Sequence, residues 1–466
     1  MTDDDRPGDD DLAEMLRRLL SGQGGIDPEQ LRQMGVSGVD PAMLQNVMRM
    51  MQGAMAGDDD GIDWSAAKTG ALHIANQDGL GITDGTRADF DQAFTLASLW
   101  LSEATAIGDL VAPPRAVTRG QWVEATLPVW QELAEPVATS ISDALLAALE
   151  SQTPEEMRSV IDGAGRLMRR VGGALFAGQL GTVIGRLSSE VVSGGDVGIP
   201  LMPDGEATIL PQNFADFGRD LEIEQDQLAL ALATRELAHA RLFRHARWLR
   251  LHVISQITEF ARGVHVDVGA LEDLASRFDP SSPEELREAI ESGALLPQRS
   301  EAQVIALTRL ENLLATIEGW VDVVTADALT RLPAADRIAE TVRRRRAAGG
   351  PAERAMASLV GLELRPRRLR EAAAMWRAVT DAVGPAARDA LWDYPDLMPS
   401  AEDIDDPAAL VARLQAHARG EEPVRDAFDD ALEALLDEES RDDAADPPAD
   451  APPGDEPEDP TGPRPV

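Results

Sequence analysis

The stretch that decides the fold is Thr234–His245, TRELAHARLFRH, which lies within a longer segment, Asp226–Gly263. This segment has a strongly helical pattern, because leucines contribute an apolar surface and residues of high helix propensity fill most other positions. Arg235 and His239 are four residues apart and share one face of such a helix, and Glu236 lies beside them. The segment therefore predicts a long helix with three neighbouring polar side chains.

The sequence RELAH differs at one position from the pattern HExxH, in which two histidines bind zinc and the glutamate activates the metal-bound water. Arg235 stands where the first histidine would be. A guanidinium has no free lone pair and stays protonated, so Arg235 cannot be a ligand and its charge repels a dication. His245 follows His239 by six residues, and it could join such a site only if the helix ended near Phe243.

A second helix is predicted at Arg309–Asp322. Glu311, Glu318 and Asp322 are spaced by seven and four residues, so they form one acidic stripe on this helix. The two helices suggest a physical alternative to a metal site. In this alternative Arg235 takes the place of the metal's charge and bridges Glu236 and Glu318 as a buried ion pair.

The segment Gly198–Pro211 breaks the helical pattern. Two short apolar runs flank Pro203-Asp204-Gly205, which is a hairpin-turn signal. A small β-hairpin is therefore predicted directly before the motif helix. The rest of the body is predicted to be mainly α, with a helix starting at Asp63-Trp64 and others near 85–107, 119–150, 154–190, 225–262, 270–278, 283–292, 300–330, 334–346, 366–383, 385–391 and 423–436.

Both ends of the chain differ from this helical body, which spans residues 61–436. Residues 1–60 form an acidic leader, predicted to be weakly ordered, and one of its short helical patterns, Pro41–Met55, carries five methionines. Such a face suits either docking to a partner or folding back on the body. Residues 437–466 are acidic, rich in proline and poor in large apolar side chains, which predicts a disordered tail.

Composition narrows the function classes. The net charge of −39 argues against nucleic acid and against an anionic membrane surface as partners. The chain has no cysteine, so a metal would have to be held by histidine and carboxylates.

The run Val171–Gly185 is too short to span a membrane, and its small residues predict tight helix packing. The acidic N-terminal residues do not resemble a signal peptide, and a cytoplasmic protein is expected.

Two further features are interpreted as structural. Trp320, next to Gly319, is expected in the core rather than in a substrate platform. The basic run Arg343–Arg346 precedes Gly349-Gly350, and it is interpreted as a solvated helix end. The alternative for this run is an anchor for an acidic partner or for the acidic tail.

Four stretches together carry a family resemblance: residues 195–214, 234–250, 310–322 and 387–407. They resemble the zincin-like metallopeptidase type 2 family, a group found mainly in actinobacteria, over roughly residues 60–420. The resemblance implies a zincin-like helical fold and zinc-dependent peptide hydrolysis. It matches Glu236 to the general base, His239 to the second zinc ligand and Glu318 to a third ligand, with His245 as a further candidate.

The sequence thus favours a zincin-like homologue whose zinc catalysis is impaired or absent, because Arg235 matches the first ligand and cannot serve as one. Two alternatives stay open. One is an active zinc-dependent peptide hydrolase that uses Glu236 as its base. The other is a non-enzymatic scaffold that binds a peptide or protein.

Overall fold

The computed structural model describes residues 62–151, 176–203, 205–262, 300–347 and 368–421, together with residues 173, 174 and 357. This part of the chain is mostly helical and contains a single two-stranded sheet, which confirms the mainly α prediction. The leader, the tail and the helices predicted near 270–278, 283–292 and 423–436 lie outside the described residues.

The helices follow the sequence pattern closely. The helices predicted over 85–107, 119–150 and 300–330 are found within a few residues of their expected ends. Helix α16 is bent at Gly384 (φ 83°), directly before Pro385, where the boundary between two helices was predicted. The elements of the body are α4 (Trp64–Gln77), α5 (Asp84–Ala104), α6 (Arg119–Ser151), a helix over 176–188, α8 (Pro211–Gly218), α9 (Gln225–His245), α10 (Arg247–Arg262), α13 (Glu301–Ala328), α14 (Ala335–Ala347), α16 (Leu369–Ala390), a 3-10 turn (Pro395–Leu397), α17 (Ala401–Asp405) and α18 (Pro407–Ala418).

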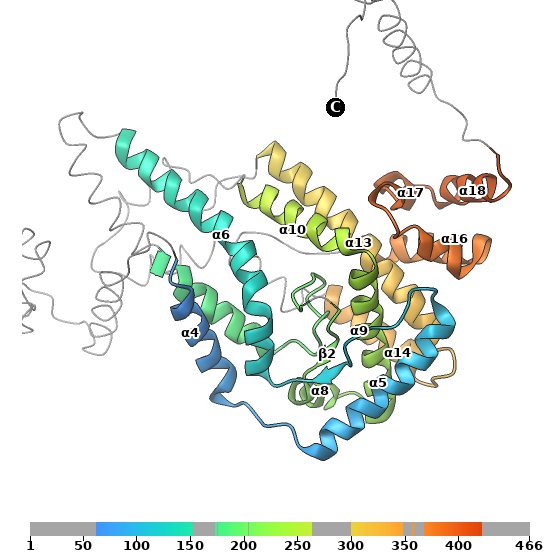
Figure 1. Cartoon of the computed structure of the whole chain (residues 1–466), viewed down its shortest axis with the longest axis horizontal. Helices are drawn as coiled ribbons and strands as arrows, with labels where there is room; N and C mark the ends of the chain where they lie inside the picture. Colours follow the sequence, from blue (N-terminus) through green and yellow to red (C-terminus); the bar gives the residue numbers. More distant parts are fainter. Residues whose placement is uncertain are drawn as a thin grey trace, which may run out of the picture.

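Helix α9, which carries the RELAH sequence, lies at the centre of the body and packs against α5 and α13 (Figure 1). It is buried on almost every side between Leu228 and Leu242. A charged side chain on such a helix needs a partner, because an unpaired buried charge is strongly destabilising. Arg241 illustrates this: its guanidinium is almost fully buried and pairs with Asp109 while donating to Ser98.

Helix α13 is the second element that shapes the site. It begins with a capping box between Ser300 and Gln303, and it packs against α9, α10 and α16. Trp320 on this helix is fully buried, and its indole N–H donates to Asp389 Oδ1 at 2.9 Å. Trp320 therefore belongs to the core, as the sequence indicates.

The single helix predicted over 225–262 is wrong in one respect, since the chain leaves helical geometry at Ala246 and divides into α9 and α10. No glycine or proline marks this break. Contacts with a distant segment accompany it instead: His245 Nε2 lies 2.8 Å from Asp393 Oδ1, and the Trp248 indole donates to the Trp392 carbonyl. Tertiary contacts thus accompany a break that local propensity does not mark.

The predicted hairpin also needs correction. Among the described residues of this region only β2 (Thr208–Ile209) is a strand, and it pairs in parallel with β1 (Arg115–Ala116). Its antiparallel neighbour is Ser193 rather than the apolar run before the turn. Pro200 and Pro203 supply no backbone N–H for a ladder in that run, whereas Gly194 donates its N–H to the Thr208 carbonyl.

The small residues of the helix over 176–188 face α4. A Cβ atom at Gly181 would come within 2.5 Å of the Ala67 carbonyl oxygen, and one at Gly185 within 2.7 Å of Ile74 Cβ. This close approach confirms the tight packing expected from the sequence. Among the residues that the structure describes, no helix is both long and apolar enough to cross a membrane.

Candidate functional site

The RELAH helix and α13 meet at Glu318. Arg235 and His239 project from one face of α9 toward this carboxylate, which is almost fully buried. Arg235 Nη2 pairs with Glu318 Oε2, and His239 Nε2 lies 3.1 Å from Glu318 Oε1. Asp322, one turn further along α13, has its Oδ1 at 3.9 Å from Arg235 Nη1. The structure therefore brings Arg235, His239 and Glu318 together as one buried cluster.

A second guanidinium reaches the same carboxylate from α14. Arg346 Nη1 lies 2.5 Å from Glu318 Oε1, and Arg346 Nη2 lies 3.4 Å from the carbonyl oxygens of Gly195 and Asp196. Arg235 and Arg346 are both largely buried, with about 12% of each side chain exposed. Glu318 is thus held between two cations from different helices.

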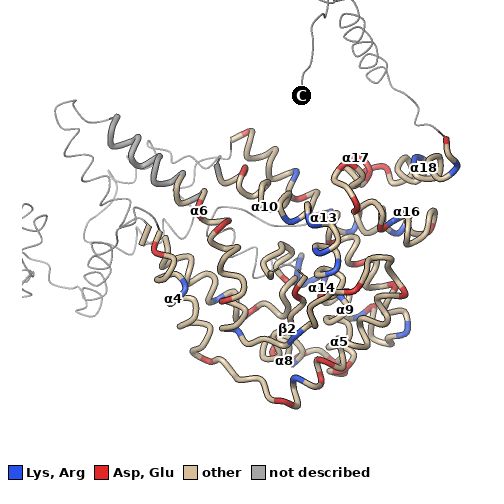
Figure 2. The backbone as a smooth tube through the Cα atoms, viewed as in Figure 1, with Lys and Arg blue, Asp and Glu red and all other residues tan. Residues whose placement is uncertain are grey.

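The interpretation of the basic run as a solvated helix end is wrong for three of its four arginines. Arg343 donates to Asp322 Oδ2 at 3.0 and 3.3 Å, and Arg345 pairs with Asp196 at 3.0 Å. Only Arg344 is mainly exposed, and it pairs with Glu340 on its own helix. Figure 2 shows the basic end of α14 close to α9 and α13. The basic run on α14 is complementary in charge to the acidic stripe on α13. This complementarity is the sequence signal from which the ion pairs between the two helices could have been predicted.

Glu236 does not bridge to Arg235. Its Oε1 accepts the N–H of Thr208 and its Oε2 accepts the N–H of Gly195, both at 2.8 Å. A Cβ atom at Gly194 or Gly195 would come within 2.8 or 3.0 Å of these oxygens, so both glycines permit the close approach of the loop. Glu236 therefore ties β2 and the preceding loop to α9.

Charge and burial set the protonation of the cluster. Burial alone would raise the pKa of Glu318, but Arg346, His239 and Arg235 outweigh burial and hold it well below its usual range. Burial lowers the pKa of His239, and the neighbouring Glu318 offsets only part of that shift. At neutral pH the cluster therefore contains an ionised Glu318, a neutral His239 and two guanidinium ions.

The donor set does not fit a zinc ion. Zinc sites in proteins use three or more protein ligands, whereas Glu318 is flanked by Arg235 and Arg346, whose guanidinium groups have no free lone pair. His239 Nε2 is buried and has no hydrogen bond of good geometry among the described residues, but it faces this occupied carboxylate. A cavity of about 20 Å³ remains beside Arg235, His239 and Arg346, enough for about one water molecule.

The other candidate ligand, His245, lies elsewhere. Helix α9 continues without interruption to this residue, so its ring points away from the face of His239. About a third of the His245 side chain is exposed, and its partner is Asp393. The structure does not bring His245 to the Glu318 cluster.

The titration of Glu236 predicts a pH dependence of stability. Burial raises its pKa from 4.5 to about 7, although the Thr208 and Gly195 N–H groups partly offset the shift. Between these values the folded protein holds a proton that the unfolded chain has released, so this stabilisation is complete below pH 4.5 and is lost as the pH rises through 7. From pH 5 to pH 8 the free energy of unfolding should fall by about 2–3 kcal/mol more in the wild-type protein than in Glu236→Gln.

Urea denaturation of both proteins across this pH range measures the difference. Glu236→Gln also carries a constant penalty, because an amide N–H₂ would face a backbone donor, but that penalty does not change with pH. A difference that stays flat, or that grows with pH, would contradict the raised pKa.

Comparisons with known proteins agree with the fold. The family model described as zincin-like metallopeptidase matches residues 62–411. The chain is also similar to a crystal structure from Chloroflexus aurantiacus described as a "putative hydrolase with a novel fold", with a TM-score of 0.52 and 18% sequence identity over 76% of this chain and 99% of that one. At this identity the similarity shows a shared fold alone. No curated protein matches the chain.

Proposed function

The chain belongs to the zincin-like metallopeptidase family, and on this premise we propose that it is a member without zinc-dependent peptidase activity that binds a peptide or protein instead. The observation that carries the proposal is the double occupation of Glu318 by Arg235 and Arg346. Two guanidinium ions together carry the charge of one zinc ion. They form ion pairs with Glu318, the carboxylate that the family resemblance assigns to the metal.

The position of Glu236 supports the same proposal. A general base must reach the water that it activates. Both oxygens of Glu236 instead accept backbone N–H groups, from Thr208 and Gly195. The carboxylate is buried and serves to hold the loop, so it is poorly placed to take a proton from a substrate water.

A binding role has a suitable cavity beside the cluster. A space of about 220 Å³ lies between α9, α13 and α14, with Arg235, Asp322 and Arg343 at one side. The remaining lining is largely apolar and includes Leu232, Leu329, Pro333, Ile338 and Val342. This volume is below the usual range for whole small-molecule ligands, and it suits an apolar side chain of a peptide next to a polar group.

Metal content and peptide hydrolysis test the proposal directly. The full chain, purified without chelators and supplied with zinc, is expected to hold no stoichiometric zinc and to cleave no peptide in a mixed library. His239→Ala and His245→Ala form a matched pair, because only His239 lies in the cluster. One zinc per chain that His239→Ala loses and His245→Ala retains would overturn the proposal and favour an active hydrolase.

A further inference from the structure

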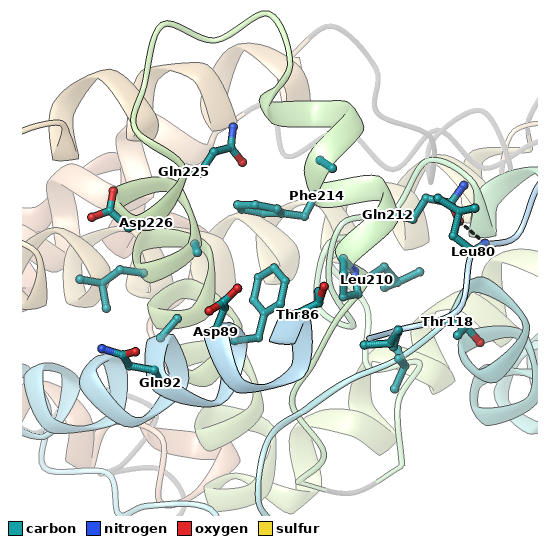
Figure 3. A pocket seen from close by; sticks show the side chains of 18 of the residues that line it. Leu80, Thr86, Asp89, Gln92, Thr118, Leu210, Gln212, Phe214, Gln225 and Asp226 are labelled. Carbon is teal, nitrogen blue, oxygen red and sulfur yellow. Dashed lines mark hydrogen bonds between the residues drawn. The ribbon is translucent and has the colours of Figure 1, made fainter. Parts of the chain in front are cut away.

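A second cavity, of about 670 Å³, is separate from the Glu318 cluster. It lies between the loop before α5, α5 itself and the N-terminal ends of α8 and α9 (Figure 3). The rings of Phe90 and Phe214 meet edge to face in its wall, with centroids 5.1 Å apart. Its volume is within the range of ligand and peptide pockets, and most of its lining is apolar.

The mouth of this cavity exposes large apolar side chains. Leu80 is 67% exposed and Leu96 is 38% exposed, and both belong to the lining. A concave apolar surface that is rimmed by polar groups commonly marks a binding site. The cavity therefore favours an occupant that presents several apolar side chains at once.

The charges at the rim restrict the occupant further. Asp89 and Asp226 both line the cavity, and neither pairs with a cation among the residues that the structure describes. The lining has one arginine, Arg119, and its guanidinium is directed to Asn213 and Asp216. A mainly apolar occupant with a positive charge would suit this rim, whereas the acidic tail would be repelled.

One segment of the chain itself has this composition. Between Asp40 and Asp58 the leader is free of acidic residues, and its only charged residue is Arg49. In a helix over Pro41–Met55, Leu44, Met48, Met51 and Met55 would form one apolar stripe, with Arg49 to one side of it. Methionine side chains adapt readily to irregular apolar surfaces.

The connection is long enough. Helix α4 has 14 residues and spans about 21 Å, and it ends just before Leu80 at the mouth of the cavity. Because Asp63 caps α4 and Ile62 packs on the core, residues 56–61 form the connection, and they can span up to about 21 Å when extended, which is about the length of α4. We propose that the segment Pro41–Met55 docks in the cavity lined by Phe90, Phe214, Leu80 and Leu96, with Arg49 at the carboxylates of Asp89 and Asp226.

Cysteine cross-linking of the full chain tests this docking without background, because the sequence has no cysteine. A pair at Met48→Cys and Gln92→Cys should form a disulfide within one chain about tenfold faster than a control pair at Met48→Cys and Leu251→Cys. Leu251 is exposed on α10, away from the cavity, whereas Gln92 lines it. Equal rates for the two pairs would overturn the proposal, and so would cross-links formed only between chains, which would assign the cavity to a second copy.

Hydrogen exchange provides a second test with a matched control on one helix. Leu96→Glu should speed amide exchange over residues 41–55 about tenfold, because it places a charge in the docking surface. Leu99→Glu should leave that exchange unchanged, since Leu99 is 63% exposed on α5 but does not line the cavity. Exchange in this segment that is equally fast in the wild-type protein and in both variants would show that it does not dock.

A charge reversal checks the placement of Arg49. Arg49→Glu should slow the Met48–Gln92 cross-link, and the added change Asp89→Arg should restore its rate. Slowing without any recovery in the double variant would remove Asp89 from the proposed contact.

Discussion

Replacing Glu318 by glutamine is expected to destabilise the protein by about 3–5 kcal/mol, the cost of breaking a buried ion pair by removal of one partner. The carboxylate is the shared counter-ion of Arg235 and Arg346, both largely buried. Without it, two guanidinium ions face each other across a site with room for about one water molecule. Urea denaturation at pH 7 measures the loss, seen as a lower midpoint with an unchanged slope.

Two further variants identify the cause of this loss. Glu340→Gln removes a carboxylate that is paired with Arg344 at the surface, and it should not change stability measurably. The triple variant Arg235→Met, Glu318→Leu, Arg346→Met removes the whole charged group and should recover most of the stability, because apolar side chains of similar volume replace buried ion networks well. A triple variant as unstable as Glu318→Gln would show that packing, rather than unpaired charge, explains the loss.

Zinc binding is expected only after two arginines are replaced. Arg235→His supplies a third candidate ligand beside His239 and Glu318, but Arg346 stays 2.5 Å from the carboxylate of Glu318 and would compete with the metal for it. One extra positive charge about 4 Å from a cation costs about 4 kcal/mol per unit charge at an effective dielectric constant of 20. The double variant Arg235→His, Arg346→Leu should therefore bind zinc at least about 100-fold more tightly than Arg235→His alone.

Calorimetric titration with zinc at pH 7.5 measures both affinities, and addition of His239→Ala to the double variant should abolish binding. Equal affinities in the single and double variants would show that Arg346 does not compete with the metal. Absence of zinc binding in the double variant would show that the geometry around His239 and Glu318 no longer suits zinc, even when a third ligand is present.

The sequence predicted much of this site because its key contacts follow helical spacing. Arg235 and His239 share a face at four residues, and Glu318 with Asp322 repeats that spacing on α13. Helix α13 also begins with a capping box, and both of its bounds could be predicted within a few residues, whereas α9 has no side-chain cap and only its start was predicted correctly. The ion pair between Arg235 and Glu318 could then be predicted on one further assumption, that the polar faces of α9 and α13 meet.

The remaining contacts depend on long-range geometry that has no local signal. The partners of Glu236 are the backbone N–H groups of Gly195 and Thr208, and a backbone N–H gives no sequence signal of which side chain it meets. Arg346 reaches Glu318 because α14 packs across α9 and α13, and a basic helix end is more often solvated. The break at Ala246 and the parallel pairing of Thr208 with Arg115 likewise follow from tertiary packing.

The sharing of Glu318 by two arginines also has an evolutionary meaning. A lineage that acquires histidine at position 235 would still have the guanidinium of Arg346 paired with Glu318, and one that loses Arg346 first would still have Arg235 paired with Glu318. Under the proposed function neither single step would restore metal binding, so selection for zinc-dependent activity would favour neither step alone. On this proposal each arginine would prevent the replacement of the other from giving a zinc site, and the two would therefore persist together.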